Sequence, residues 1–447
     1  IGESAFENSG IKTIRFVAGS KLEIIEKRTF FGCDLLTSVI FEGNSDLVEV
    51  RESAFENCGK MQVFHNTKGS IYALGERAFY GATSLENFKI NETELTEIGK
   101  DCFGDNKFIG ESDDKMVFVG TVLIKYNGKL DSVVKIPAKT TSIGNSAFAG
   151  NGFIETVIFM TQNGKTQIKE IQESAFENCI SLKTVKLPDS VTTIGARAFA
   201  RCGALTEIEL GNGVTAIGRG AFASCGSLAE ITITSSVDNF DGSAFNGCDS
   251  LAEIKVTGSN KYYSVDGVVY EYKTTKTDGQ QIRTAKLVAY PNGLTAQQGA
   301  YLVPKTIAVN GTSYSVMGIG DYAFSGCNKS EVSKIMLHSE ITSIGKYAFE
   351  ETEVAVVFDD NVKITEFSDY IFSKYEGNEI KIPNSVTTIG KHAFENVKNV
   401  STIEIPVAVS AIGEYAFANT SAEIKWNANC ALETVSDYGF AGYKGNN

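Results

Sequence analysis

The sequence of 447 residues has few of the features on which enzymes, metal sites and membrane spans usually depend. Its three histidines, His65, His338 and His392, are widely separated, which argues against a histidine-centred active site. It contains no nucleophile-elbow, zinc-protease, P-loop or dinucleotide-binding motif. It also lacks an apolar run of about twenty residues, so no transmembrane helix is expected. No secretory signal peptide is visible.

Positive charge is also scarce, because 54 Asp and Glu outnumber 41 Lys and Arg and give a formal net charge of −13. An acidic surface repels phosphate backbones and anionic lipids. The composition therefore argues against nucleic-acid binding and against electrostatic attachment to a membrane. A hydrophobic content of 43% with 10% aromatic residues is nevertheless typical of a folded protein rather than a disordered one.

What the sequence has instead is repetition. The segment VTTIG at residues 191–195 returns as VTAIG at 214–218, and Ala198-Phe199 returns as Ala221-Phe222, each 23 positions later. Most intervals between such phenylalanines are 22 to 25 residues, and the exceptions are 45, 28 and 79 residues. A period of 20 to 29 residues with a recurring apolar core indicates leucine-rich repeats. These marker phenylalanines are Phe6, Phe30, Phe55, Phe79, Phe103, Phe148, Phe176, Phe199, Phe222, Phe245, Phe324, Phe349, Phe372, Phe394, Phe417 and Phe440.

One coil shows how the repeat would fold. The apolar residues Leu182, Val185 and Leu187 predict a short strand with these side chains directed inward. Pro188 ends this strand because proline cannot donate the next ladder hydrogen bond. Ile194 belongs to a second inward pair, Gly195 permits a crowded backbone turn, and Phe199 fills the coil interior. Stacked coils can bury these residues, although a single coil cannot.

The recurring pattern SIGxxAFxxCxxLxxIxIPxxVTxIG resembles the BspA-like leucine-rich repeats, also called the Treponema pallidum type. Representative coils are residues 194–210, 217–233 and 389–405. We therefore expect one α/β repeat solenoid over residues 1–447, a right-handed superhelix with a parallel sheet on its concave side, short strands and turns elsewhere, and two inserted β-hairpins. The resemblance also implies an adhesive protein that is secreted or exposed at the cell surface, without catalytic residues or cofactors.

The first long interval predicts a hairpin-type insert at residues 107–136. Asn127-Gly128 lies between the apolar pairs 123–124 and 133–134, a strong hairpin-turn signal. The interval of 28 residues predicts a single enlarged loop around Asn163-Gly164.

The second long interval predicts a larger hairpin-type insert at residues 258–315. Asp266-Gly267 and Asp278-Gly279 are expected to form turns beside strands at residues 268–272 and 285–290.

Seven of the nine cysteines lie three residues after a marker phenylalanine, so they should form one column in the stack. The preferred interpretation is a column of small buried thiols. Disulfides between stacked neighbours are the alternative, although the odd total argues against a complete set. No C-x-x-C pair or histidine partner indicates zinc. The seven are Cys33, Cys58, Cys179, Cys202, Cys225, Cys248 and Cys327.

Strand residues between the inward ones should face outward and offer a binding surface. Glu207, Glu230 and Glu253 occupy the same coil position, so they should stack as an acidic column that could contact a basic partner or a cation. The alternative is a solvated face with splayed side chains. The candidate contact residues on this face are Thr184, Lys186, Glu207, Glu209, Glu230, Thr232, Glu253 and Lys255.

The second insert is rich in tyrosine, a residue favoured at interfaces because it combines a large apolar body with a hydroxyl. Packing of the hairpin against neighbouring coils is the alternative interpretation. The candidate contact residues here are Tyr262, Tyr263, Tyr270 and Tyr272.

These observations favour an extracellular or cell-surface protein that binds a protein or glycan ligand, such as host extracellular matrix, without catalysis. The alternative is a structural spacer or stalk that presents another domain. The chain opens on IGESAF, the middle of a repeat. We therefore expect the natural protein to extend further, with any export signal, anchor or companion domain outside this sequence.

Overall fold

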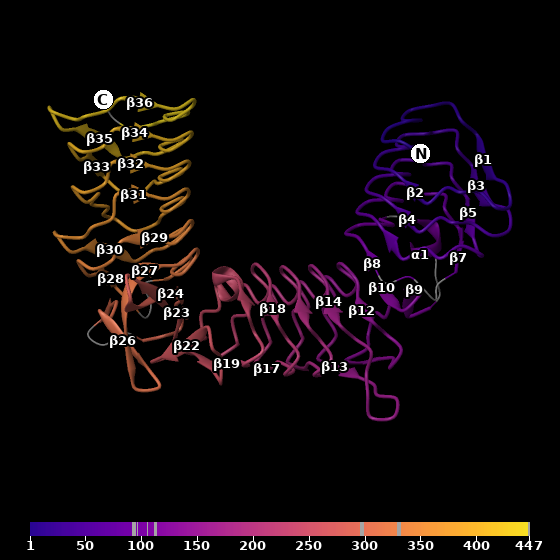
Figure 1. The fold of residues 1–447 in the computed structure, drawn as a ribbon, viewed down its shortest axis with the longest axis horizontal. Coiled ribbons are helices and arrows are strands. Elements are labelled where there is room, and N and C mark those ends of the chain that lie inside the picture. Colours follow the sequence, from indigo (N-terminus) through magenta and orange to yellow (C-terminus); the bar gives the residue numbers. More distant parts are fainter. Residues whose placement is uncertain are drawn as a thin grey trace. The chain divides into compact units, whose positions relative to one another are not determined.

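A computed structural model describes residues 1–91, 95, 97–104, 106–110, 114–295, 299–328 and 332–445. The chain divides into two compact units: unit 1 comprises residues 1–179 and 190–198, and unit 2 comprises residues 180–189 and 199–447. Each unit is a stack of coils in which equivalent strands lie one above another (Figure 1). A single solenoid over residues 1–447 stays a prediction, because each unit is described by itself.

In unit 1 each of the first coils contributes a four-residue strand and a two-residue strand. Each strand pairs in parallel with the equivalent strand of the next coil. The longer strands are β1 (Thr13–Phe16), β3 (Ser38–Phe41), β5 (Val63–Asn66) and β7 (Asn87–Ile90). The shorter strands are β2 (Ile24–Ile25), β4 (Glu49–Val50), β6 (Ala73–Leu74) and β8 (Glu97–Ile98).

The rest of unit 1 contributes strands to two further ladders, which are separate from those of the first coils. One ladder contains β9 (Met116–Val119), β10 (Val122–Tyr126), β12 (Ser142–Ile143), β14 (Glu170–Ile171) and β16 (Thr193–Ile194). The other contains β11 (Val133–Ile136) and β13 (Thr156–Phe159). Gly195 is required for close stacking, because a Cβ there would lie 2.7 Å from the backbone carbonyl carbon of Gln172.

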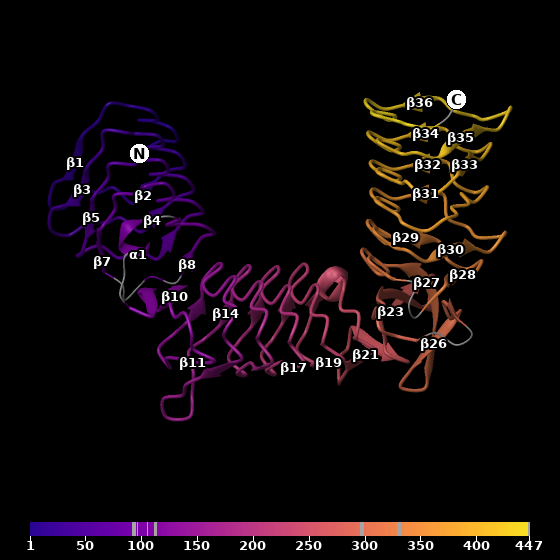
Figure 2. The ribbon, with the colours of Figure 1, turned by 180° about the vertical axis from the view of Figure 1, so that it is seen from behind.

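Unit 2 repeats the arrangement, with coils stacked from β28 to β36 in the view from behind (Figure 2). The longer strands are β15 (Thr184–Lys186), β17 (Glu207–Glu209), β19 (Glu230–Ile233), β21 (Glu253–Val256), β25 (Ala300–Leu302), β28 (Lys334–Leu337), β30 (Ala355–Phe358), β33 (Thr402–Ile405) and β35 (Glu423–Trp426). The shorter strands are β18 (Ala216–Ile217), β20 (Asn239–Phe240), β29 (Ser343–Ile344), β31 (Glu366–Phe367), β32 (Thr388–Ile389), β34 (Ala411–Ile412) and β36 (Thr434–Val435).

The expected class, a repeat solenoid with parallel sheets, is confirmed, and the described residues contain almost no helix. The helices are α1 (Lys107–Gly110) and the 3₁₀-helix η1 (Gly242–Phe245), each of four residues. The return segments form only alternate hydrogen bonds within themselves, such as those from Thr29 to Glu26 and from Phe31 to Arg28. The intervening backbone N–H groups, those of Arg28, Phe30 and Gly32, donate to carbonyls of the next coil at 2.8 to 3.0 Å. The fold is therefore a β-solenoid.

The marker phenylalanines form the centre of each stack. Phe30 and Phe55 lie with ring centroids 5.1 Å apart and planes 10° apart, and Phe199 and Phe222 are 5.5 Å and 2° apart. All four side chains are almost completely buried. Offset stacking of this kind stabilises aromatic pairs beyond the area that they bury, so the repeated phenylalanine sets the spacing of the coils.

The hairpin predicted at Asn127-Gly128 is wrong. β10 pairs antiparallel with β9 around a turn at Gly120-Thr121, whereas β11 pairs in parallel with β13. Asn127 and Gly128 do not adopt the positive φ that a two-residue hairpin turn needs. A Cβ at Gly128 would lie 2.2 Å from the Tyr126 hydroxyl, so the glycine there permits close packing instead. The boundaries 107–136 and 258–315 of the inserts stay predictions.

The turns of the second insert follow the sequence signals. Asp266-Gly267 and Asp278-Gly279 each have positive φ at both residues, and each joins two antiparallel strands. Asn310-Gly311 forms a third turn of this kind, which the sequence analysis missed. Asn163-Gly164 also has positive φ at both residues, between Gln162 and Lys165, which form an isolated antiparallel bridge.

The strands of this insert pair in the order β22-β23-β24-β27-β26, and β29 pairs with β27. They are β22 (Tyr262–Val265), β23 (Val268–Thr277), β24 (Gln280–Ala289), β26 (Thr306–Val309) and β27 (Thr312–Ile319). β23 and β24 are each ten residues long, longer than the expected strands at 268–272 and 285–290.

Candidate binding surfaces

The outward residues of β15, β17, β19 and β21 lie where the alternation predicts. Along each strand the middle residue is buried and its neighbours face solvent. Thr184 and Lys255 are half-buried, and the other six candidates are exposed: Lys186, Glu207, Glu209, Glu230, Thr232 and Glu253. A shallow groove of about 550 Å³ runs between β17 and β19 and is lined by several of them.

The predicted acidic column is partly neutralised by lysine. Glu230 and Glu253 are directly opposite in the β19–β21 pair, where like charges repel. The Lys255 Nζ lies 2.6 Å from Glu230 and 3.5 Å from Glu253, so it compensates both carboxylates. The bond to Glu230 is the main cause that raises the pKa of Lys255. Lys186 pairs in the same way with Glu209 at 2.5 Å.

The tyrosines of the second insert are mostly committed to packing. Tyr262 and Tyr270 are only 4% and 1% exposed, so neither ring is available to a partner, and their proposed contact role is wrong. The Tyr270 hydroxyl bonds to that of Tyr301 at 2.9 Å. Tyr263 and Tyr272 are half-buried against the same core. The alternative interpretation, packing of the hairpin, describes these side chains better.

An apolar row on unit 2 was missed by the sequence analysis. Leu302 is opposite Met336, and Met336 is opposite Val357, across β25, β28 and β30. Their exposed fractions are 62%, 40% and 38%, whereas outward positions elsewhere on this face are mostly polar. A signal was present: the strand segments KIML and AVVF carry apolar residues on both faces. Contiguous exposed apolar side chains often mark a contact surface.

A groove of about 610 Å³ lies farther along the same face of unit 2. Its floor includes Thr402, Glu404, Lys425 and the exposed indole of Trp426. We use the name outer sheet face for the apolar row together with this groove. Its mixture of aliphatic, aromatic and charged groups is typical of a protein-binding surface.

Six aromatic side chains stack along one edge of unit 2, and we call them the aromatic column. Each lies two residues before a marker phenylalanine and has a positive φ between 53° and 59°. Successive ring centroids are 4.4 to 5.1 Å apart, with planes within 13° of parallel. The Arg219 guanidinium lies 5.2 Å from the first ring. The members are Tyr322, Tyr347, Tyr370, His392, Tyr415 and Tyr438.

In some coils of unit 1 the equivalent position carries an arginine in an ion pair instead. Arg28 bonds to Glu7 of the preceding coil at 2.5 Å, and Arg77 bonds to Glu56 at 2.6 Å. Both arginines also have positive φ. The same backbone position is therefore occupied by ion-paired arginine in these coils and by stacked rings in the aromatic column.

All nine cysteines are free, so the stacked disulfides left open by the sequence do not occur here. Eight are buried and Cys430 is half-buried. Their thiols have a specific partner: the Cys58 and Cys225 Sγ atoms donate to the carbonyls of the preceding markers, Phe30 and Phe199, each at 3.1 Å. Thr352 occupies the same slot and donates its hydroxyl to Phe324 at 2.7 Å. The column is thus a row of buried donors.

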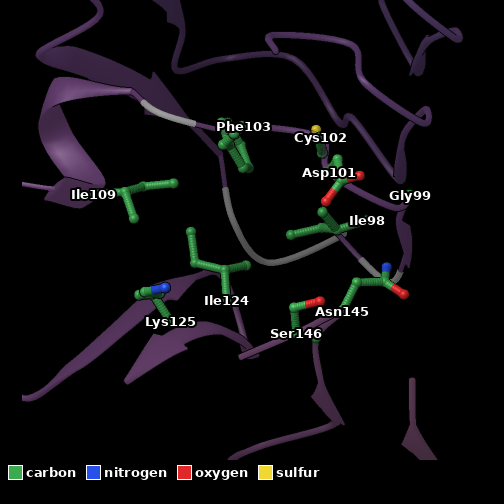
Figure 3. A pocket seen from close by; sticks show the side chains of 12 residues that line it. Ile98, Gly99, Asp101, Cys102, Phe103, Ile109, Ile124, Lys125, Asn145 and Ser146 are labelled. Atoms are coloured by element: carbon green, nitrogen blue, oxygen red, sulfur yellow. The ribbon is translucent and has the colours of Figure 1, made fainter. Parts of the chain in front are cut away.

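A small cavity of about 130 Å³ in unit 1 lies beside the first insert. Ile98, Ile109 and Ile124 extend toward it, with Phe103 above and Lys125 at its rim (Figure 3). Among the described residues of this lining, Asp101 is the one carboxylate and there is no histidine. These groups offer packing surface rather than acid–base chemistry.

The described residues provide no obvious metal centre or membrane segment. Within them, no group of three or more His, Cys, Asp or Glu side chains is placed to hold a metal ion. In the same part of the chain, no helix has the length and apolar character needed to cross a membrane.

Comparisons with known proteins agree on the fold. The sequence profile of the BspA type leucine rich repeat region matches residues 1–111, 141–267 and 317–446 in six copies. The chain is similar to a leucine-rich cell surface protein from Faecalibacterium prausnitzii, with 22% identity, 73% of this chain and 100% of that chain covered, and a TM-score of 0.50.

A second similar structure is the pneumococcal vaccine antigen PcpA, with 21% identity, 74% of this chain and 71% of that chain covered, and a TM-score of 0.51. No curated protein matches the sequence. At these identities the two structures support the fold alone.

Proposed function

The chain belongs to the family of BspA-type leucine-rich repeat proteins, and from this premise we propose that it is a cell-surface or secreted protein that binds a protein partner. The proposal assigns binding to the outer sheet face of unit 2 and involves no catalysis. A cell-surface structural relative supports this location. Adhesion to host extracellular matrix is the specific form of binding that we propose.

The apolar row carries this proposal. Leu302, Met336 and Val357 are fixed side by side by the strand register, yet each leaves more than a third of its surface in solvent. Burying such side chains contributes about 25 cal/mol per Å² of apolar area removed from water. The acidic face around Glu207 and Glu230 has no comparable apolar group, so it fits a contact rim better than a contact centre.

The test is binding of the full chain to a panel of extracellular-matrix proteins and mucosal glycans, measured by biolayer interferometry. Val357→Lys should weaken binding to a protein ligand roughly tenfold or more, because it places a charge at the centre of the contact. Val435→Lys is the matched control, since Val435 is a similarly exposed valine, 47% against 38% for Val357, and lies on a strand of the other ladder. Equal loss in both variants would remove the outer sheet face from consideration.

Failure to bind any panel member would count against adhesion and favour the spacer alternative. A spacer also predicts that substitutions on the outer sheet face leave every interaction of the chain unchanged.

A further inference from the structure

Strand β11, at residues 133–136 of unit 1, has one backbone edge without a partner strand. It pairs in parallel with β13 on one side, and the described strands include none that pairs with its other side. The described part of the chain has no isolated bridge to β11 either. An unpaired edge is a template on which another extended chain can add as a further strand.

The hydrogen bonds to β13 show which backbone groups of β11 are free. The Ile136 carbonyl accepts from the Met160 N–H at 2.9 Å, so Ile136 is directed toward β13. Along a paired strand, alternate residues direct their N–H and C=O groups to the same neighbour. Val134 therefore bonds to β13 as well. Val133 and Lys135 direct their N–H and C=O groups to the open edge.

Exposed apolar side chains lie beside this edge. Val133 is exposed, and Leu130, three residues before it, is 80% exposed. Phe153 is 53% exposed and is the residue equivalent to Leu130 in the next coil, as the register of β11 against β13 shows. The Asn151 side chain donates to the Gly128 carbonyl at 2.9 Å, which holds the two segments together. Contiguous exposed apolar side chains often mark a contact surface.

The charge beside the edge is positive, although the whole chain has a net charge of −13. Lys129 and Lys135 lie on either side of Val133, and neither forms an ion pair with a described residue. Asp131, the one carboxylate between these lysines, is already paired with Lys115 at 2.7 Å. Two β11 edges placed together would oppose their lysines, which discourages pairing with a second copy. An acidic strand meets no such repulsion.

We propose that the open edge of β11 binds an extended acidic segment of a partner protein. The segment adds to the sheet as a further strand, through the free backbone groups of Val133 and Lys135. Its carboxylates lie beside Lys129 and Lys135, and its apolar side chains cover Leu130 and Phe153. This site belongs to unit 1, so it is separate from the outer sheet face and does not depend on the function proposed for that face.

The first test measures the binding of a fluorescent peptide of four Glu-Val repeats to the full chain by fluorescence anisotropy. This peptide should bind, and the same peptide with lysine in place of glutamate should bind roughly tenfold more weakly, because it repels Lys129 and Lys135. A Glu-Val peptide with one proline on each of its edges should also lose affinity, since it lacks N–H groups for pairing. Equal binding of the three peptides, or no binding of the Glu-Val peptide, would overturn the proposal.

The second test changes the edge itself. Val133→Pro should lower the affinity for the Glu-Val peptide roughly two- to tenfold, because it removes one outward N–H and leaves the bonds to β13 in place. Thr13→Pro is the matched control. Thr13 lies on β1, an end strand of another ladder in unit 1, and its N–H also points away from the neighbouring strand. Equal effects of the two substitutions would contradict binding at β11.

A charge reversal keeps the test independent of proline. Lys135→Glu leaves the backbone unchanged and should also weaken binding of the Glu-Val peptide, while it should strengthen binding of the lysine peptide. Unchanged affinities for both peptides would contradict the proposal.

Sedimentation velocity of the chain alone distinguishes a second copy as the occupant of the edge. The mass should be the same with and without Val133→Pro. A dimer that Val133→Pro dissociates to the 48.2 kDa chain would assign the edge to self-association and overturn the acidic partner.

Discussion

Tyr370 and His392 stack face to face across two neighbouring coils, with ring centroids 4.4 Å apart and planes 7° apart. Tyr370 has a second stacking partner, Tyr347, at 4.5 Å. Each of these residues also holds a left-handed backbone conformation that is costly for a side chain larger than glycine. The stacking offsets that cost and couples the successive coils of unit 2 that lie between Tyr322 and Tyr438.

Replacing Tyr370 by alanine should therefore destabilise unit 2. Two stacked contacts are lost, each worth about 0.5–1.5 kcal/mol, which suggests a loss of about 1–3 kcal/mol. Thermal or denaturant unfolding of the variant measures this change. Tyr370→Phe is the control, because it keeps both stacks and should unfold close to the parent chain. Similar unfolding of the two variants would argue against an energetic role for the column.

The buried position of Cys225 holds a hydrogen-bond donor, and this predicts the order of stability of variants at Cys225. Its Sγ donates to the Phe199 carbonyl, and Thr352 and Thr420 make the equivalent bond in other coils. Cys225→Thr should thus be tolerated. Cys225→Val, nearly equal in volume to threonine, should be less stable by about 0.5–1.5 kcal/mol because the donor is lost. Denaturant midpoints of the two variants give the comparison. Equal midpoints would show that a hydrogen-bond donor at this position does not contribute to stability.

Alkaline pH should weaken the folded chain through its buried thiols. Burial raises the pKa of Cys179 and of Cys327 from the ordinary 9.0 to about 12. The folded chain therefore keeps these protons while the unfolded chain releases them above about pH 9. The stability contribution is complete below pH 9 and is lost as the pH rises toward 12.

The measurement is the unfolding midpoint between pH 8 and roughly 12, a window bounded by these pKa values. A double variant, Cys179→Thr with Cys327→Thr, should lose less stability over this range than the parent chain. Parallel pH profiles for the two proteins would show that other groups cause the loss.

Lys255 should stabilise the outward face mainly at low ionic strength. Its replacement by alanine leaves Glu230 and Glu253 opposed without compensation. The unfolding midpoint should fall in dilute buffer, and the difference should shrink in 1 M salt, where screening extends over about 3 Å. The double variant Lys255→Ala with Glu253→Gln should show little dependence on salt. A salt-independent effect of Lys255→Ala would point to packing of its aliphatic stem instead.

Much of the fold could be predicted because each coil repeats the same physical problem. A marker such as Phe199 must fill the same interior slot as Phe222, so the sequence itself reveals the period. The buried cysteine column followed from the same reasoning. The near-absence of helix was harder to predict, because alternate backbone N–H groups of the return segments bond to the next coil, and local sequence does not indicate that partner.

The candidate surfaces were predicted less well, for two different reasons. Tyr270 belongs to a tyrosine-rich hairpin, but its composition alone could not distinguish an exposed ring from a ring buried against Tyr301. The row of Leu302, Met336 and Val357 depends on a register across β25 and β28, which are separated in the sequence by β26 and β27, two strands that belong to another sheet. The aromatic column did have a readable signal, since its members all precede a marker by two residues.

The coil-to-coil ladders have a mechanical consequence. Within each unit a coil contacts chiefly its neighbours, so a pulling force applied through the chain would detach coils in succession rather than rupture one core. A coil of 23 residues, the spacing of Phe199 and Phe222, would release roughly 75–80 Å of extended chain. Under tension the protein would lengthen in regular steps, as an extensible tether does.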